Sequence, residues 1–247
     1  MAINSYGGFL IMLIGCVTFL SCQEKDRAQS VIDQSIAYHG GKKFNKSHIE
    51  FDFRNRHYVF QRSDGIFEYQ RIFKDSIWTV KDILTNEGLT RFRDDEKEEL
   101  SDEWKRRYSN SVNSVAYFSL LPFGLNDPAV IKEILPDGMV EGKEYIKIKV
   151  TFREEGGGED FNDIFLFWIN KANYSLDYFG YVYFNDGGGT RFRKAIKQHR
   201  QNGIVLQDYL NYGSPKTDIP IETLDQVYES GQINLLSEIL LENVVIK

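Results

Sequence analysis

The most regular feature of the chain is an alternation of apolar and polar residues with a period of two, which is typical of strands with one buried face. Ile49, Phe51 and Phe53 alternate with charged residues, and the apolar phase then slips, which predicts a β-bulge near Asn55. Turn residues separate the strand-like runs that follow. These runs are Ile66–Phe73, Ile77–Leu84, Leu89–Arg93, Tyr145–Phe152, Asp163–Ile169, Tyr174–Phe184, Thr190–Lys197, Ile204–Tyr212 and part of Leu235–Ile246.

Two neighbouring runs differ from the others because they are apolar at both parities. In Asp163–Ile169, the residues Ile164, Leu166 and Trp168 stand on one face, and the opposite face is equally apolar. Such a strand needs cover on both sides. In Tyr145–Phe152, by contrast, Lys147 and Lys149 predict a face in contact with solvent.

Helical periodicity is found in two segments. Ala28–Tyr38 carries apolar residues at helical spacing and ends at Gly40. Tyr108–Leu121 suits a helix that ends before Pro122. The pattern predicts a mainly β (α+β) fold, with residues 28–247 forming one domain. We expect a strongly curved antiparallel sheet or half-barrel of about ten strands, covered by two or three helices.

The first 23 residues contain no charged side chain and no histidine, and Gly7 to Ser21 is an uninterrupted stretch of apolar and small residues. This length suits the core of a secretory signal better than a membrane-spanning helix. Phe19-Leu20-Ser21-Cys22 resembles a bacterial lipobox. We therefore expect a lipoprotein signal peptide over residues 1–21, lipidation of Cys22 and a tether over residues 22–27. An uncleaved anchor and a conventional signal are the alternatives.

The residues after Cys22 bear on location. Gln23 does not resemble the aspartate that retains lipoproteins in the inner membrane, and Glu24 and Asp26 resemble the acidic start of surface-export signals. We expect a protein of the cell envelope, anchored by lipid to the outer membrane and facing the periplasm or the cell surface.

Cysteine use and charge exclude several classes of function. The chain has only Cys16 and Cys22, so a mature domain has no disulfide, no cysteine-ligated zinc and no cysteine nucleophile. A net charge of −6 argues against nucleic acid as a partner. The histidines are dispersed, and His39 suits a cationic cap at the end of a helix. We expect no metal, no cofactor and no enzymatic activity.

Two glycine runs lie between predicted strands, at Gly156–Gly158 and Gly187–Gly189. They are interpreted as hairpin turns, with an anion-binding or calcium-binding loop as the alternative. Arg191 and Arg193 follow the second run on one strand face, with Phe192 opposite. They could clamp a carboxylate or phosphate head group, or form a solvated face.

Several segments together resemble an uncharacterised lipoprotein family of Bacteroidota over nearly all of the mature chain. The segments are Tyr38-His39-Gly40-Gly41, Phe51-Asp52-Phe53-Arg54, the long run from Asn110 to Val130 and Asp186-Gly187-Gly188-Gly189-Thr190-Arg191-Phe192-Arg193. The order of elements is also similar to outer-membrane lipoprotein-sorting proteins of the LolA/LolB kind. That similarity implies a half-barrel that holds acyl chains under a helical lid.

The high aromatic content, 18 Phe, 14 Tyr and 3 Trp, favours an apolar pocket. We expect the protein to bind or transfer a lipid or acyl chain, with Tyr108–Leu121 covering the strand face of Ile164, Leu166 and Trp168. The residues expected to bind this ligand are Ile164, Leu166, Trp168, Tyr117, Phe118, Arg191 and Arg193. The alternatives are an envelope hydrolase or carbohydrate-active enzyme that uses a carboxylate pair, with Asp160, Asp163, Asp177 or Asp186 as candidates, and a purely structural lipoprotein.

Overall fold

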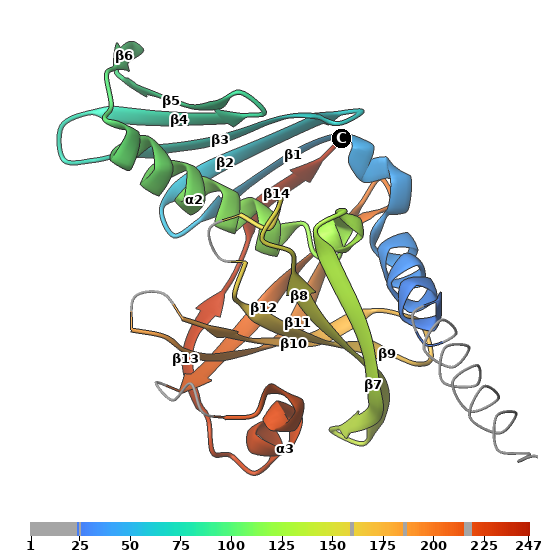
Figure 1. The fold of residues 1–247 in the computed structure, drawn as a ribbon. Coiled ribbons are helices and arrows are strands. Elements are labelled where there is room, and N and C mark those ends of the chain that lie inside the picture. Colours follow the sequence, from blue (N-terminus) through green and yellow to red (C-terminus); the bar gives the residue numbers. More distant parts are fainter. Residues whose placement is uncertain (1–23, 25, 159–160, 185–186, 215–218) are drawn as a thin grey trace, which may run out of the picture.

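The chain forms two antiparallel β-sheets that lie one above the other, with helices between and outside them (Figure 1). The computed structural model describes residues 24, 26–158, 161–184, 187–214 and 219–247. Each sheet has seven strands. The prediction of a mainly β fold with curved antiparallel sheets is confirmed, although the described residues form fourteen strands in two sheets rather than about ten in one.

The strands of the first sheet are, in spatial order, β14 (Glu242–Ile246), β1 (Lys46–Phe53), β2 (Arg56–Ser63), β3 (Ile66–Lys74), β4 (Thr79–Thr85), β5 (Gly88–Arg93) and β6 (Glu96–Glu98). The strands of the second sheet are β13 (Asn234–Ile239), β12 (Ile204–Ser214), β11 (Gly189–Gln201), β10 (Leu176–Tyr183), β9 (Ile164–Asn170), β8 (Lys143–Phe152) and β7 (Val130–Val140). Each sheet is therefore a meander that receives one strand from the end of the chain. Only Leu240 and Leu241 separate β13 from β14, so the C-terminal segment joins the two sheets.

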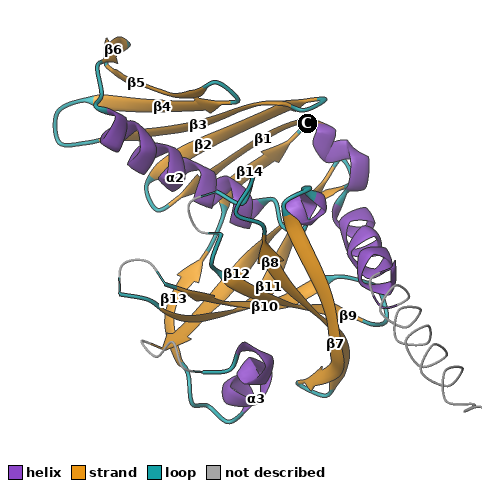
Figure 2. Cartoon of the chain, viewed as in Figure 1, coloured by secondary structure: helices purple, strands orange, loops and turns teal. Residues whose placement is uncertain are grey.

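The helices occupy three places (Figure 2). An N-terminal helix over residues 26–39 leads into the short 3-10 helix η1 (Gly41–Asn45). Helix α2 (Asp102–Ser119) and the 3-10 helix η2 (Phe123–Asn126) connect the two sheets. The 3-10 helix η3 (Ile221–Thr223) and α3 (Leu224–Glu229) lie against the far side of the second sheet.

Both faces of the second sheet are buried, as the doubly apolar strands predict. Its inner face carries Phe165 and Phe167 and packs against the N-terminal helix through Val31 and Ile32. Its outer face carries Trp168, which packs against η3 and α3. The buried positions of the N-terminal helix recur at helical spacing, as expected for an amphipathic helix.

The expected bulge near Asn55 is wrong. The phase slip there marks a two-residue hairpin turn between β1 and β2, whose residues pair without interruption from Phe53 and Arg56 onward. Arg54 and Asn55 both have positive φ, 50° and 58°. Positive φ at both central residues is the backbone conformation of the two-residue hairpin turns whose twist matches that of the flanking strands. Asparagine tolerates this conformation well.

The expectation of a solvated face on Tyr145–Phe152 is also wrong. Lys147 is 7% exposed, and its ammonium donates to Asp225 Oδ2 at 3.2 Å and to the Glu222 carbonyl at 2.6 Å. Helix α3 thus covers this face of β8 and supplies a counter-charge. The sequence did not reveal α3, because a six-residue helix is too short for a periodic pattern.

Strand β7 was also not predicted. Its alternation is interrupted around Pro136, where the pairing with β8 shifts register between Leu135 and Gly138. Because β7 is the edge of the second sheet, it can contain a proline at an irregularity without losing a ladder partner on both sides.

Candidate functional site

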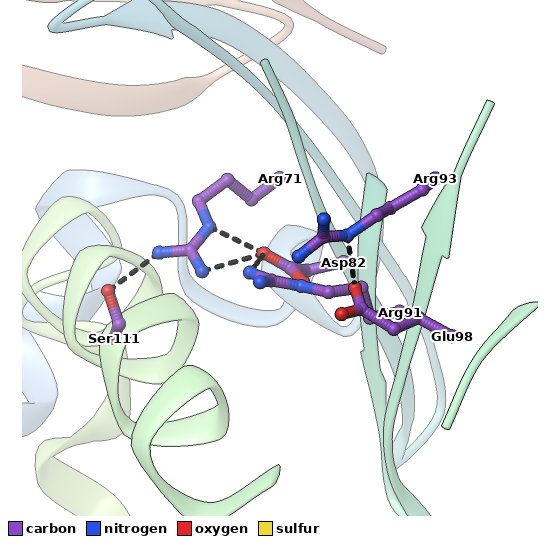
Figure 3. A network of polar contacts seen from close by, with 6 residues as sticks. All are labelled: Arg71, Asp82, Arg91, Arg93, Glu98 and Ser111. Atoms are coloured by element: carbon purple, nitrogen blue, oxygen red, sulfur yellow. Dashed lines mark hydrogen bonds and ion pairs between the residues drawn. The ribbon is translucent and has the colours of Figure 1, made fainter. Parts of the chain in front are cut away.

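The N-terminal half of α2 is fixed to the first sheet by a buried network of charges (Figure 3). Asp82, which is fully buried, accepts from Arg71 at 2.6 and 2.9 Å and from Arg91 at 2.6 and 3.0 Å. Arg71 also donates to Ser111 Oγ on α2 at 2.6 Å, and the Arg91 guanidinium lies over the Tyr108 ring at 3.3 Å. The carboxylate therefore holds two arginines, and both of them contact the helix.

The C-terminal half of α2 contacts both sheets, because Val112 and Ala116 pack in the core of the first sheet while Tyr117 and Phe118 face the second. Phe118 stacks on Phe179 with ring centres 5.9 Å apart and lies 5.4 Å from the Tyr181 ring. Tyr117 meets Phe165 edge to face at 6.0 Å. The helix thus spans the space between the sheets and brings two of the predicted site residues, Tyr117 and Phe118, against the inner face of the second sheet.

Two adjoining hollows lie beneath this half of the helix, and we call them together the aromatic groove. The central hollow has a volume of about 410 Å³. The arginine hollow has a volume of about 240 Å³ and shares Ser114, Phe118 and Tyr181 with the central one. The aromatic side chains of the central hollow are Tyr117, Phe118, Phe152, Phe165, Tyr181 and Tyr183.

Polar groups border the central hollow at a few points. Asn110, Asn113 and Asp163 are among its lining residues, and Gly157 and Gly158 from the first glycine run form part of its wall. A third hollow of about 690 Å³ adjoins it beyond Tyr117 and continues toward the first sheet. The central hollow therefore combines six aromatic side chains with the polar or charged side chains of Asn110, Asn113, Ser114, Asp163 and Arg191.

Arg191 and Arg193 lie on the inner face of β11 and line the groove, while Phe192 is buried on the outer face. This confirms the predicted alternation. Arg191 donates to Tyr183 Oη at 2.7 Å. Arg193 donates to Tyr181 Oη at 3.2 Å and lies over the rings of Phe118 and Phe179 at 4.2 and 5.3 Å.

Burial alters the acid–base properties of the groove. It lowers the pKa of Arg193 and raises the pKa of Tyr117 and of Tyr209, so both phenols keep their protons. The Tyr117 hydroxyl is buried and has no hydrogen-bond partner among the described residues. A buried hydroxyl without a partner is costly, so the Tyr117 hydroxyl is a polar group that a ligand could satisfy.

The other three predicted ligand-binding residues are not in the groove. Leu166 and Trp168 belong to the outer face of the second sheet, where they are fully buried with Leu224 beneath α3, and Ile164 packs at the edge of this cluster. Trp168 Nε1 donates to Asp225 Oδ2 at 3.2 Å. The structure therefore covers this face with α3 and not with α2, because α2 lies on the opposite side of the sheet.

The candidate carboxylates do not form a pair across one cleft among the described residues. Asp163 lines the central hollow, whereas Asp177 accepts hydrogen bonds from Tyr145, Asn170 and Ser175. Asp160 and Asp186 lie outside the described residues. Among the described residues, no three or more His, Cys, Asp or Glu side chains form a cluster that could hold a metal ion.

The four histidines make contacts within the fold, and three of them contact a carboxylate. His48, His57 and His199 contact Glu50, Asp52 and Asp208. His39 stands at the end of its helix, but it is fully buried, and burial lowers its pKa from 6.5. The expectation of a cationic cap is therefore wrong, because desolvation disfavours the charged imidazole. Its Nδ1 lies 2.8 Å from the Ser35 carbonyl, which the neutral ring can reach as a donor.

Sequence reasoning missed several residues of the groove. Phe152, Phe165, Tyr181 and Tyr183 stand on strands that were predicted correctly, yet strand periodicity does not tell which face meets which helix. Arg54 of the arginine hollow lies in the hairpin turn that was interpreted as a bulge. A correct hairpin assignment would have been the signal for it.

The chain belongs to the family of unknown function DUF6503, whose model matches residues 8–243. No curated protein matches the chain. It is similar to a solved LolA superfamily protein, NE2245 from Nitrosomonas europaea, with a TM-score of 0.44, 10% identity and coverage of 74% of this chain and 84% of that one. It is also similar to an outer membrane lipoprotein-sorting protein domain from Vibrio parahaemolyticus, with a TM-score of 0.44, 9% identity and coverage of 76% and 86%.

The resemblance to an uncharacterised family that the sequence suggests is thus confirmed by the DUF6503 model. Cys22, the expected site of lipidation, lies outside the described residues, as does most of the tether that follows it. In the part of the chain that the structure describes, no helix has the length and apolar character needed to span a membrane.

Proposed function

We propose that this protein binds or carries an apolar ligand, a lipid or an acyl chain, in the aromatic groove. The observation that carries the proposal is the central hollow of about 410 Å³ between α2 and the second sheet, which is bordered by six aromatic side chains. A hollow of this size falls within the usual range of ligand pockets, about 300–1,000 Å³. An apolar chain that fills the groove would bury its own surface and that of the surrounding rings.

The position of α2 between the two sheets supports this role. Its first half is held to the first sheet through Arg71 and Tyr108, and its second half covers the groove. The rings of Phe118, Phe165 and Tyr181 then line the ligand site from two different layers of the fold. A small separation of α2 from the second sheet would admit a chain without unfolding either sheet. The role proposed is binding and not catalysis.

The cellular setting is part of the same proposal. Acylation of Cys22, after removal of residues 1–21, would tether the domain to a membrane through residues 22–27. We place it in the cell envelope, on the outer membrane. An apolar ligand could then pass between the membrane and the groove over a short distance.

The test is a titration of the delipidated protein with a fluorescent long-chain fatty acid. Ser114 borders both hollows and is exposed, so Ser114→Trp should fill the groove and abolish saturable binding. Phe118→Ala should weaken binding by ~1–3 kcal/mol through the loss of an apolar contact.

Trp104→Ala is the matched control for Phe118→Ala, because Trp104 is an aromatic residue of the same helix that stacks on Tyr108 and is 46% exposed, away from the groove. Its binding should equal that of the unmodified protein, and thermal melting should verify that each variant is folded. Absence of saturable binding by the unmodified protein would overturn the proposal and favour a structural lipoprotein.

A further inference from the structure

The arginine hollow differs from the central hollow in charge. Its lining residues include Arg54 and Arg193, and the described residues that line it include no aspartate and no glutamate. Asp163, the acidic residue of the groove, borders the central hollow instead, together with Arg191. The two ends of the groove therefore differ in electrostatic character, although the aromatic walls are continuous through Phe118 and Tyr181.

Arg193 has no carboxylate partner among the described residues. Its hydrogen bond goes to Tyr181, its other close contacts are aromatic faces, and its Nε is buried without an acceptor. Arg191, two residues earlier on the same strand face, donates to the Thr190 carbonyl and to Tyr183 Oη. The two arginines that are buried as whole residues, Arg71 and Arg91, share Asp82, whereas the half-buried Arg62 contacts a tyrosine hydroxyl and aromatic rings as Arg193 does.

An unpaired guanidinium at such a place is costly. Arginine keeps its proton under all ordinary conditions, so Arg193 is a standing positive charge among phenylalanine and tyrosine rings. Cation–π contacts compensate in part, but the buried Nε still lacks an acceptor. A planar fork of this kind matches the two oxygens of a carboxylate or phosphate.

We propose that the ligand is an anionic amphiphile, whose carboxylate or phosphate head lies in the arginine hollow against Arg193 while its apolar chain occupies the central hollow. This inference rests on the proposed function and adds the chemical class of the ligand. The balance of charge gives the direction, because Asp163 offsets Arg191 at the central hollow, whereas the charged lining residues described for the arginine hollow are both positive. Arg54, at the turn between β1 and β2, adds positive charge at the entrance.

The experiment compares three probes with the same sixteen-carbon chain on the delipidated protein, namely palmitate, hexadecyl phosphate and hexadecanol. A charged hydrogen bond to the head should make at least one of the two anions bind about tenfold more tightly than the alcohol. The stronger of the two identifies the head group. Inorganic phosphate should not displace either anion, because it lacks the chain.

Arg193→Gln should reduce the ratio of anion affinity to alcohol affinity to about one, and Arg193→Lys should retain a ratio above one because it keeps the charge. Arg200→Gln is the control, since Arg200 stands on the same strand but is exposed and contacts Tyr38 outside the groove. This variant should keep the full ratio. Thermal melting establishes that the Arg193 variants are folded.

Equal binding of the alcohol and both anions by the unmodified protein would overturn this inference and leave the proposed function intact. A preference for anions that persists in Arg193→Gln would also overturn it, because Arg193 would then serve only to hold Phe118. Failure of all three probes to bind would instead overturn the proposed function itself.

Discussion

The guanidinium of Arg193 lies 4.2 Å from the centre of the Phe118 ring, and this contact joins a strand of the second sheet to a helix that is fixed to the first. Phe118 therefore contributes both to the packing of α2 and to the shape of the groove. It holds the end of α2 over the second sheet, and it forms the boundary between the central and arginine hollows. Any ligand that reaches Arg193 along the groove must pass this ring.

Asp82 should be the most sensitive polar position of the first sheet. Asp82→Asn removes the charge that Arg71 and Arg91 share, and it leaves two buried guanidinium groups without an anion. We expect the free energy of unfolding to fall by ~3–5 kcal/mol, as is usual when one partner of a buried ion pair is removed. Urea denaturation measures this change directly.

Glu103→Ala provides the control for that experiment. Glu103 pairs with Arg107 one turn along α2, but both side chains are 59% exposed. An exposed pair of this kind contributes ~0.3–0.5 kcal/mol, so the urea midpoint should barely move. A small effect at Asp82, comparable with that at Glu103, would contradict the view that this network fixes α2 to the sheet.

Stability should depend on pH through His39. Burial lowers its pKa in the folded protein from 6.5, whereas the unfolded chain keeps the ordinary value. The unfolded state therefore binds more protons below pH 6.5, and the free energy of unfolding should decrease as the pH falls from 7 to 5. His39→Gln should flatten this part of the curve, and an unchanged slope would show that His39 is not its source.

Metal should not be required for folding. The described residues contain no cluster of metal ligands, and the glycines of the two loops adopt the positive φ angles that turns require, such as 83° at Gly156 and 87° at Gly187. EDTA should leave the melting temperature unchanged. A decrease of several degrees would favour calcium binding by the acidic residues beside these loops, since a metal bound by the native state alone stabilises it.

Cys22→Ala tests the proposed anchor. Lipidation requires the thiol, so the variant should incorporate no radiolabelled palmitate and should keep its leader, while Cys16→Ala should be labelled normally. Equal labelling of the Cys22 variant, or a mature protein that still contains residues 1–21, would exclude the lipobox interpretation.

Local patterns in the sequence predicted most of the strands. Strand-like runs bounded by turn residues placed β3, β8, β9 and β12 within a few residues of their observed bounds, because one or both faces of each strand are buried. Helical spacing of apolar residues predicted the N-terminal helix through Val31, Ile32 and Ile36. Helical spacing found α2 only in part, since its first six residues are exposed and all but Trp104 are charged, so that no apolar stripe marks them.

Of the residues predicted to bind the ligand, some lie at the groove and others do not. Tyr117, Phe118, Arg191 and Arg193 meet at the groove, but Ile164, Leu166 and Trp168 lie across the sheet beneath α3. A strand that is apolar on both faces gives no indication of which helix covers which face. That choice depends on the crossing of α2 between the sheets, which the Arg71 contact with Ser111 fixes over a separation of 40 residues.

The central claim, that the aromatic groove holds an apolar ligand, is tested most directly by native mass spectrometry of the protein purified from its own envelope without detergent exchange. The account predicts a species heavier than the protein by the mass of one lipid or acyl compound, recovered by solvent extraction and absent from Ser114→Trp. A single ligand-free mass for the unmodified protein, or the same bound mass in Ser114→Trp, would contradict it.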